Sequence, residues 1–576
     1  MGSADGLKPF FRCGQTWYNF FSVSKFNACK ECPQVKQDQV GQEIIMLGDD
    51  AIGRGAIEAG ISLATSYPGT PATQILEYIA RNFSGEVEWS VNEKVALETA
   101  IGASYAGKRA LCSMKHVGLN VASDPLMTAA YLGIKGGLVV AVSDDPSAYS
   151  SQNEQDSRFY AYFAKIPCFE PSDSQEAKDM TIMAFELSEL MGLPVMLRTV
   201  TRICHGYSPV MLGTVREQNA LLLQKDPANM IAVPSNVLKC HSKLRAKQEG
   251  LLQWGIDAGL NKSFKNGQKK GIITCGIGYS YAMEYGPEYA ILKIAYYPFA
   301  ETLIGEFVEG LEEVWVLEEG EPFVEEIARR YSSRVKGKLS GEISSIGELG
   351  PDVMTEFIPG WSSDRGDYTL SRPLPPRPPV LCPGCAHGKF YEALKAVQPA
   401  FTAGDIGCYT LGANPPYQIV DTCLCMGAGI SQAAGISKQG VKRVAAVIGD
   451  STFIHSGIPA LINAVYNKAN ILVLILDNSA VAMTGNQPTP LTGRTAKGGE
   501  GGKIVLEELC KACGATSVEV TDPYDRQKTE ALLREKLDAD GVNVIISRRP
   551  CVFVTRREMK LKRKTTDYIP AGEKAP

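Results

Sequence analysis

Residues 444–487 read VAAVIGDSTFIHSGIPALINAVYNKANILVLILDNSAVAMTGNQ, and their pattern predicts a strand, a helix and a second strand. The runs 444–448 and 471–476 are continuously apolar and have the length of buried strands. Between them, residues 458–466 carry apolar side chains at helical spacing. Because crossovers of this kind are right-handed, the two strands are expected to be parallel strands of one sheet.

Two polar pairs follow these strands, Gly449-Asp450 and Asp477-Asn478. The carboxyl ends of parallel strands meet at one edge of a sheet, which is where open α/β sheets bind ligands. A carboxylate and an amide oxygen at that edge are hard ligands, which suit Mg²⁺ together with the oxygens of a bound phosphate. The alternative interpretation is that Asp450 and Asn478 only turn the chain after each strand.

The Gly-Asp pair and the later Asn resemble the diphosphate-Mg²⁺ motif of thiamine-diphosphate enzymes. This resemblance implies that the side chains of Asp450 and Asn478 and the backbone carbonyl of Ala480 hold Mg²⁺. It also implies that the bound thiamine diphosphate is contacted by Gly449, Ser451 and Thr484.

Length and composition limit the class of this protein. A chain of 576 residues is too long for one core, and about three or four domains are expected. A net charge of -4 argues against a nucleic-acid-binding surface. We find no apolar run that would cross a membrane and no secretory leader, so a cytoplasmic location is expected. The 16 cysteines, several of them in Cys-x-x-Cys pairs, indicate metal ligands more than a disulfide framework.

The alternation of strands and helices predicts an α/β fold with three doubly wound domains. They cover residues 42–245, 266–365 and 381–555, with a less patterned connection over about 205–265. The Pro-rich segment 366–380 is expected to be an extended spacer. By the resemblance, the three domains are of the pyrimidine-binding, transketolase C-terminal-like and diphosphate-binding types, in that order. No polar constellation stands out in the middle domain, which is expected to be structural or to serve association.

The two ends of the chain fall outside these domains. Residues 1–41 form an arm with three cysteines, Cys13, Cys29 and Cys32, which are either an incomplete set of metal ligands or part of a loosely docked segment. Residues 556–576 form a solvated basic tail. Isolated cysteines in apolar surroundings are interpreted as core residues; these are Cys112, Cys168, Cys204, Cys240 and Cys275.

One glutamate is the candidate for the acid that acts on the cofactor. In thiamine-diphosphate enzymes a Glu at the start of a helix, from a separate domain, bonds to the aminopyrimidine ring of the cofactor. The sequence WSVNEKVALETAIGAS places Glu93 there, followed by small residues, and Glu98 is the fallback. The alternative is that Glu93 is only a first-turn acid that interacts favourably with the helix dipole.

Three further residues are candidates for the substrate site. Thr70, in the rigid turn YPGTP, resembles the substrate-contacting Thr of the 2-oxoacid:ferredoxin oxidoreductases. Arg158, in SSQNEQDSRFYA, has a planar guanidinium that suits a carboxylate, although an Arg in a polar loop is usually a surface charge. His116, after Lys115 at a strand end, is a candidate active-site group or a structural histidine.

Four cysteines decide the expected class of reaction. Cys382 and Cys385 form a CPGC turn that brings two thiolates to one metal centre, and two distant cysteines, Cys408 and Cys551, complete a four-thiolate shell for a cubane cluster or zinc. The pattern resembles the [4Fe-4S]-bearing thiamine domain of 2-oxoacid:ferredoxin oxidoreductases. Buried free thiols are the alternative. The remaining cysteines of this domain are interpreted as packing residues; these are Cys423, Cys425, Cys510 and Cys513.

Within that superfamily the chain resembles the large subunit of the indolepyruvate ferredoxin oxidoreductases, through YPGTP, NEKVALE, MKHVGLNVASDP, EEGEPFVEE and DIGCYTLG among other motifs. The resemblance implies oxidative decarboxylation of an arylpyruvate to an aryl-acetyl-CoA, with ferredoxin as the electron acceptor. It implies a heteromer, such as (αβ)₂, with a smaller beta subunit. A non-redox decarboxylase and a catalytically silent scaffold are the alternatives.

The sequence departs from this family in two places. The family's large subunit usually ends in a ferredoxin-like domain with CxxCxxCxxxCP repeats, and these are not found here, so either the sequence is truncated or another polypeptide takes the electrons. After CPGC, this chain has Ala386-His387-Gly388 where the family usually has Pro-His-Arg. The role of that Arg is therefore in doubt here, and the preferred 2-oxoacid and the CoA site leave no pattern.

Overall fold

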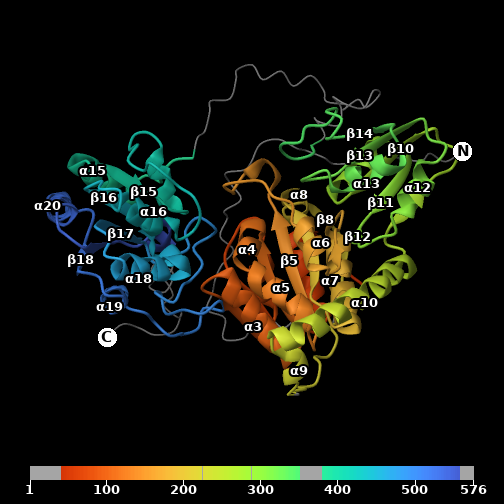
Figure 1. Cartoon of the computed structure of the whole chain (residues 1–576), viewed down its shortest axis with the longest axis horizontal. Helices are drawn as coiled ribbons and strands as arrows, with labels where there is room; N and C mark the ends of the chain where they lie inside the picture. Colours follow the sequence, from red (N-terminus) through yellow and green to blue (C-terminus); the bar gives the residue numbers. More distant parts are fainter. Residues whose placement is uncertain (1–39, 224, 287, 351–378, 558–576) are drawn as a thin grey trace, which may run out of the picture.

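The computed structural model describes residues 40–223, 225–286, 288–350 and 379–557, which form three mainly parallel sheets and a two-stranded ribbon (Figure 1). The arm with Cys13, Cys29 and Cys32, most of the Pro-rich spacer and nearly all of the basic tail lie outside the described residues. Among the described residues, no helix is both long and apolar enough to cross a bilayer.

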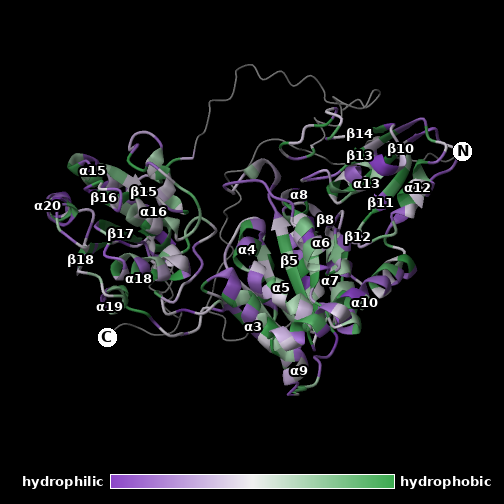
Figure 2. Ribbon diagram, viewed as in Figure 1, coloured by the Kyte–Doolittle hydropathy of each residue, from purple (hydrophilic) through white to green (hydrophobic). Residues whose placement is uncertain are grey.

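The first sheet has seven strands in the order β12-β6-β7-β5-β4-β2-β3. All neighbours are parallel except β12 and β6. Runs such as LVVAVSD are buried on both faces, as expected for a parallel sheet covered by helices (Figure 2). Its strands are β2 (Leu63–Ser66), β3 (Glu86–Trp89), β4 (Ala110–Lys115), β5 (Leu138–Asp144), β6 (Cys168–Phe169), β7 (Val195–Val200) and β12 (Tyr296–Tyr297).

Two groups of helices pack around this sheet. One consists of α1 (Gly48–Glu58), α2 (Thr73–Asn82) and α7 (Ser174–Met191), and the other of α3 (Glu93–Tyr105), α4 (His116–Val121) and α5 (Ser123–Leu132). The short helix α6 (Arg158–Ala164) follows the loop after β5, and the short helix α8 (Thr201–Cys204) follows β7 directly. An antiparallel ribbon of β1 (Glu43–Leu47) and β8 (Tyr207–Met211) adjoins α7.

The middle sheet has the strand order β14-β13-β10-β11-β9. Strand β12 follows β11 in the chain but does not join the middle sheet. It pairs with β6 of the first sheet, because the ring of Tyr296 packs on Phe169 and Trp254. The strands are β9 (Lys262–Phe264), β10 (Lys270–Cys275), β11 (Ala290–Ile294), β13 (Glu313–Leu317) and β14 (Val335–Lys336), with helices α11 (Ile277–Tyr285), α12 (Thr302–Val308) and α13 (Phe323–Tyr331).

The third sheet has the parallel order β15-β16-β17-β19-β18. Strands β16 (Val444–Gly449) and β17 (Ile471–Asp477) are parallel neighbours joined through α18 (Ile458–Tyr466), which confirms the predicted unit. The other elements are β15 (Phe401–Ala403), β18 (Ser517–Thr521), β19 (Val542–Arg548), α15 (Ala386–Val397), η3 (Cys408–Ala413), α16 (Ala428–Ser437), α17 (Asp450–Thr452), η4 (Phe453–Gly457), α19 (Leu506–Ala512) and α20 (Arg526–Leu537).

The expected connection between the first two domains is more regular than its sequence pattern indicated. Helix α10 (Pro234–Ala258) runs through 25 residues of it, preceded by the short helix α9 (Pro227–Met230). Only a few side chains of α10 are buried, among them Leu244 and Leu251, so no broad apolar stripe is visible in the sequence. Its Lys, Gln, Leu and Arg residues favour helix nonetheless.

A buried ionic network joins the first and middle sheets. Arg198, on β7, forms ion pairs with Asp144 at 2.8 Å and with Glu170. Its Nη2 donates to the carbonyl of Glu319, which follows β13 of the middle sheet. Arg158 forms ion pairs with Asp156 at 2.5 Å and with Glu318 at 2.9 Å. Since buried charges are stable only when paired, this network fixes the two sheets against each other.

The interpretation of Arg158 as a clamp for a substrate carboxylate is therefore wrong. Its side chain is only 1% exposed and its guanidinium is engaged by carboxylates and by two backbone carbonyls, those of Glu319 and Glu321. The sequence showed a polar loop but not the middle domain that covers it. Arg158 instead holds the first and middle sheets together.

Glu319 gives this junction a predicted pH dependence. Burial raises the pKa of Glu319 from 4.5 to about 8, although Lys338 and Arg198 partly offset the effect. Between these values the folded protein keeps a proton that the unfolded chain has released, so the contribution of this group to stability falls as pH rises. We expect Glu319→Gln, which cannot ionise, to raise the Tm relative to wild type increasingly from pH 5 to pH 8.5. A Tm difference that is constant with pH, measured by calorimetry, would contradict this.

Candidate active site

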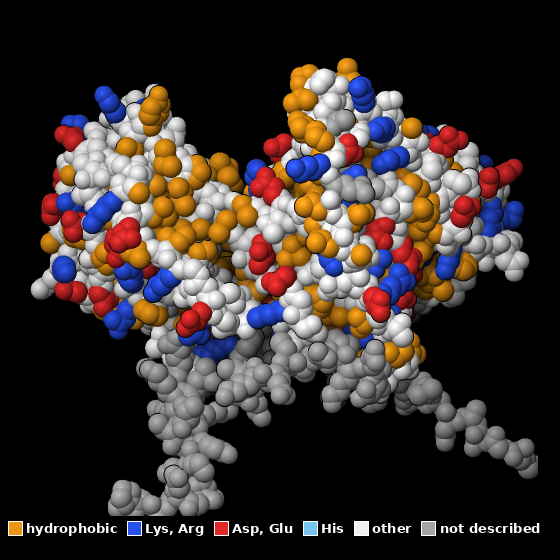
Figure 3. All heavy atoms as spheres, turned by 90° about the horizontal axis from the view of Figure 1, so that it is seen from below, with side chains coloured by type: hydrophobic (Ala, Val, Ile, Leu, Met, Phe, Trp, Pro, Cys, Tyr) orange, Lys and Arg blue, Asp and Glu red, His pale blue; other side chains and the backbone are white. Residues whose placement is uncertain are grey.

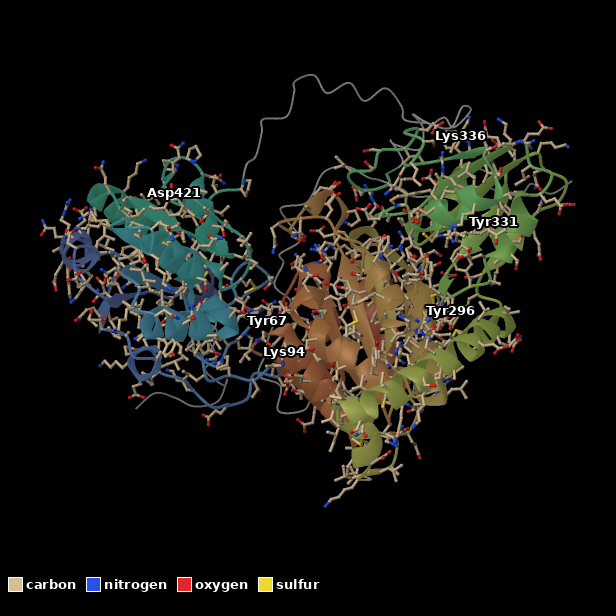
Figure 4. The ribbon with its side chains drawn as sticks, in the orientation of Figure 1. Tyr67, Lys94, Tyr296, Tyr331, Lys336 and Asp421 are labelled. Carbon is tan, nitrogen blue, oxygen red and sulfur yellow. The ribbon has the colours of Figure 1, made fainter. Side chains whose placement is uncertain are left out.

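The first and third sheets meet through their carboxyl-edge loops, and polar side chains from both meet there. Tyr67, just after β2, lies at this boundary in Figure 4, and its hydroxyl is 2.9 Å from Ser451 Oγ. Seen from below in Figure 3, hydrophobic side chains gather on the flank of the third-sheet lobe next to the other lobe. A further bond joins the lobes, from Gln487 Nε2 to Glu77 Oε1 at 2.8 Å. The site is therefore built between two parts of one chain.

Glu93 occupies the first turn of α3 and faces the third-sheet lobe. The helix begins there because the Asn92 side chain accepts a hydrogen bond from the backbone N–H of Val95, at 2.9 Å. Glu93 is 4% exposed, and its Oε2 lies 2.8 Å from His455 Nε2. Gly118 on α4 leaves the space for this carboxyl, because a Cβ there would lie 2.6 Å from Glu93 Cγ.

His455 lies on η4 and is held from both lobes. Its Nδ1 is 2.6 Å from Ser456 Oγ, and its backbone carbonyl accepts from Asn92 Nδ2 at 3.0 Å. The Tyr67 ring packs edge-on against the imidazole with centroids 4.7 Å apart. The bond to Ser456, the ring contact with Tyr67 and the backbone contact with Asn92 thus fix His455 opposite Glu93.

The predicted Mg²⁺ ligands lie together at the ends of β16 and β17. Asp450 Oδ2 accepts from the backbone N–H of Ser479 at 3.0 Å, and Asn478 Oδ1 accepts from that of Ala480 at 3.1 Å. Asp450 is buried, and burial together with the neighbouring Asp477 carboxylate raises its pKa well above the usual value. Two carboxylates this close favour a bound cation.

The donor set suits Mg²⁺ better than a metal held by side chains alone. Arg548 pairs with Asp477 at 2.7 Å, but Asp450 forms no ion pair within the part of the chain that the structure describes. In that same part, no three His, Cys, Asp or Glu side chains surround a single metal position. Mg²⁺ typically takes one or two carboxylates and completes its shell with phosphate oxygens and water. The residues present therefore fit Mg²⁺ bound together with a diphosphate.

The other predicted cofactor residues surround this group. Gly449 lies against the ring of Tyr409, and a Cβ there would be 2.4 Å from Tyr409 Cε1. Ser451 bonds to Tyr67 as described above. Thr484 Oγ1 donates to Gln487 Oε1 at 2.6 Å, in the loop that reaches Glu77 of the first lobe. The structure thus brings all three next to the junction of the two lobes.

The segments of the four predicted cluster cysteines lie around Asn478: the N–H of Cys551 donates to its carbonyl at 2.9 Å, and His387, two residues after Cys385, lies 3.2 Å from its amide nitrogen and meets the ring of Tyr409, next to Cys408. Cys382, Cys385, Cys408 and Cys551 are all partly buried and unpaired. Burial, followed by the charges of the other three thiols, raises the pKa of Cys408 to about 12. A four-iron cluster spreads its thiolate ligands over separate irons, so it does not require the closer packing of a single-ion site.

The other cysteines follow the predictions in part. The five interpreted as core are all buried: Cys112, Cys168, Cys204, Cys240 and Cys275. Of those interpreted as packing residues, Cys510 is buried and Cys513 partly so. Cys423 and Cys425 are exposed, because they lie in a loop before α16 and not in a regular element, so their assignment to packing is wrong.

The substrate-site candidates of the first lobe lie around the YPGTP turn. The carbonyl of Thr70 accepts from Ser150 Oγ at 3.1 Å. Lys115 donates to the carbonyl of Ser150 at 2.9 Å, and burial lowers its pKa to about 8, although Asp145 and Glu93 partly offset this. His116 is fully buried, and its Nε2 lies 3.1 Å from the carbonyl oxygen of Asn153. That contact joins His116 to the loop that contains Asn153. Arg158 is not part of this group.

Three residues at the junction were not found from the sequence. His455 and His387 belong to the quoted segments FIHSGI and CPGCAH, but a histidine has no spacing rule that predicts its partner. Asp405 accepts backbone hydrogen bonds from Gly427 at 2.9 Å and Gly429 at 3.1 Å, which fix the start of α16. Its burial raises its pKa to about 6. The only feature of the sequence that pointed to Asp405 was its place in the DIGC motif.

Comparisons with known proteins match the same two lobes. The family "Pyruvate flavodoxin/ferredoxin oxidoreductase, thiamine diP-bdg" matches residues 54–248, and "Thiamine pyrophosphate enzyme, C-terminal TPP binding domain" matches residues 405–547. The indolepyruvate oxidoreductase subunit IorA of Archaeoglobus fulgidus is 40% identical over 93% of this chain and 90% of its own length. The subunit of the same name from Methanothermobacter thermautotrophicus is 40% identical over 91% and 89%. That from Thermococcus kodakarensis is 40% identical over 91% and 88%.

The close approach of Gly118 to Glu93 can be tested by substitution. In Gly118→Ala the new methyl overlaps Glu93 Cγ and Oε1, so we expect the Glu93–His455 bond to break and stability to fall by about 1–3 kcal/mol. The matched control is Gly102→Ala on α3, where nothing lies within 4 Å of the new atom. There we expect a gain of about 0.5–1 kcal/mol. Denaturant melts and titration with thiamine diphosphate and Mg²⁺ measure both variants; equal effects at the two positions would contradict the prediction.

Proposed function

The chain belongs to the family of the indolepyruvate oxidoreductase subunit IorA, and we propose that it is the catalytic subunit of a thiamine-diphosphate-dependent 2-oxoacid:ferredoxin oxidoreductase. Its reaction is the oxidative decarboxylation of arylpyruvates of the indolepyruvate type to aryl-acetyl-CoA and CO₂. One observation carries this proposal: Glu93 of the first lobe and the Asp450–Asn478 group of the third meet at a single junction.

The oxygen ligands are assigned to the diphosphate end of the cofactor. Asp450 and Asn478 through their side chains, and Ala480 through its backbone carbonyl, would hold Mg²⁺. Gly449, Ser451 and Thr484 would contact thiamine diphosphate. When bound, this cofactor would supply a nucleophilic carbon for the substrate carbonyl and a cationic thiazolium ring that takes up the electrons left on the substrate as CO₂ departs.

Glu93 and His455 act on protons at the other end of the site. The 2.8 Å contact places one proton between Glu93 Oε2 and His455 Nε2. Because Glu93 is almost fully shielded from water, a hydrogen bond from it to the pyrimidine ring would be stronger than in solvent. Ser456 Oγ, at His455 Nδ1, extends this proton path. Tyr67 and Asn92 hold the imidazole in place throughout.

The four predicted cluster cysteines are assigned to a [4Fe-4S] cluster. Cys382, Cys385, Cys408 and Cys551 would each bind one iron as thiolates, and iron supplies the positive charge that four neighbouring thiolates need. When bound, the cluster carries single electrons from the active site to ferredoxin.

Partners and substrates follow from the same assignment. The similar proteins are named as subunits, which supports a heteromer with a smaller beta subunit, such as (αβ)₂. Thr70, in the turn next to Lys115, is assigned to contact with the arylpyruvate; His116 fixes the adjoining loop. Turnover of indolepyruvate, phenylpyruvate and pyruvate with CoA and a viologen dye, with the beta subunit present, tests the proposal.

Two other functions use part of the same site. A non-redox thiamine-dependent decarboxylase would need Glu93, Asp450 and Asn478 but no iron. A silent scaffold would need neither cofactor. The mutual effect of these thiols on the pKa values of Cys385 and Cys408, together with the contacts of Cys551 and His387 with Asn478, favours the oxidoreductase over both. Absence of thiamine diphosphate binding at millimolar cofactor would favour the scaffold.

Two glutamates of α3 provide a matched test of the acid. Glu93→Gln keeps the shape of the side chain but removes the carboxylate, so we expect kcat to fall by about 100-fold or more. Glu98→Gln is the control, since Glu98 is exposed and only pairs with Lys94 on the same helix. Its activity should stay within twofold of wild type. Steady-state assays with indolepyruvate decide between them, and a larger loss in the Glu98 variant would transfer the role to that residue.

Cysteine variants test the cluster assignment. We expect anaerobically purified protein to contain about four irons and four acid-labile sulfides per chain, as in a cubane. Cys408→Ala should lose most of this iron, whereas Cys510→Ala, which alters a buried packing residue on α19, should retain it. Iron-free wild type would rule out the oxidoreductase and leave the simple decarboxylase.

A further inference from the structure

Asn478 occupies the point where the oxygen ligands and the cysteine segments meet. Its side-chain Oδ1 accepts from the backbone N–H of Ala480 at 3.1 Å, which is one of the two contacts that orient the amide. Its Nδ2 therefore faces His387 Nε2, at 3.2 Å. Its backbone carbonyl accepts from the N–H of Cys551 at 2.9 Å. Its Oδ1, its Nδ2 and its backbone carbonyl thus each have a hydrogen-bond partner.

His387 ties Asn478 to the CPGC turn. It lies in the first turn of α15, two residues after Cys385, and is 4% exposed. Because Asn478 Nδ2 can only donate, His387 Nε2 must carry the lone pair, so the ring is neutral with its proton on Nδ1. The His387 ring also meets the Tyr409 ring edge-on, 6.2 Å between centroids, and Tyr409 follows Cys408. The segment of Cys551 therefore reaches Asn478 directly, through its backbone N–H. The segments of Cys385 and Cys408 reach it through the side chain of His387.

The ring of His387 holds the amide whose Oδ1 would bind Mg²⁺. Without an acceptor for Nδ2, the buried amide would rotate to find one, and Oδ1 would leave its place. The backbone bond from Cys551 restrains the same residue from the other side. Movement of either cysteine segment is thus passed to a single metal ligand.

We propose that His387 is a positioning residue that couples occupation of the four-cysteine shell to binding of Mg²⁺ and thiamine diphosphate at Asn478. This inference rests on the proposed function. Iron in the shell fixes the segments of Cys385 and Cys551, and these segments fix Asn478. The cofactor site is then already formed before thiamine diphosphate and Mg²⁺ bind. Since coupling between two binding events is reciprocal, bound cofactor also holds iron in the shell.

The test compares cofactor affinity in iron-loaded and iron-stripped protein. Full-length protein, purified anaerobically and with or without chelator treatment, is titrated calorimetrically with thiamine diphosphate in Mg²⁺. We expect binding about five- to tenfold tighter in the iron-loaded form, the factor that one hydrogen bond typically contributes. The reciprocal readout is the rate of iron loss to a chelator, which the cofactor should slow by a similar factor.

Three variants separate positioning from general packing. In His387→Ala we expect both ratios to fall toward one, leaving only the part carried by the backbone bond from Cys551 to Asn478, while the iron content under anaerobic conditions stays near wild type. His387→Gln should restore part of both ratios, since its amide oxygen reaches the position of Nε2 and accepts from Asn478. His241→Ala, on α10 and remote from the site, is the control and should keep both ratios.

The outcomes separate this inference from the proposed function. Equal affinities in iron-loaded and iron-stripped wild type, or an unchanged ratio in His387→Ala, overturn the coupling while the proposed function stands. Protein that binds neither iron nor thiamine diphosphate overturns both. The rate of iron loss to a chelator is measured on iron-loaded wild type. It therefore shows whether the two sites are coupled even where iron-stripped protein is unstable.

Discussion

The hydrogen bond between Glu93 Oε2 and His455 Nε2 is the constraint on which the rest of this site depends. Both side chains are buried, and an unpaired carboxylate or imidazole in that position would be strongly destabilising. Each residue satisfies the other only if the first and third lobes meet in one arrangement. The Tyr67–Ser451 and Gln487–Glu77 bonds hold that arrangement on either side.

Buried charge is used differently at the two junctions of the first sheet. Toward the middle sheet, Arg158 and Arg198 neutralise a group of carboxylates, and the result is a rigid contact. Toward the third sheet, the buried Asp450 carboxyl lies beside Asp477 and forms no ion pair with a cationic side chain in the described part of the chain. A buried carboxyl of this kind is expected where a metal ion binds.

Several elements could be predicted because their causes are local. The βαβ unit of β16, α18 and β17 follows from apolar periodicity, and the helix that begins at Glu93 from its Asn92 cap. Helix α10 was not predicted, because its few buried residues make no broad apolar stripe. The role of Arg158 was misjudged, because its partners Glu318 and Glu319 lie some 160 residues later in the chain.

The sequence by itself determined the α/β units, the residue types at the strand ends and, through its motifs, the family. Those features depend on spacing along the chain, which the order of residues states directly. Only the tertiary structure decided that His455 faces Glu93, that His387 binds Asn478 and that Arg158 lies in an interdomain core. These contacts join residues far apart in sequence, and which distant side chains share a buried space depends on how whole sheets pack.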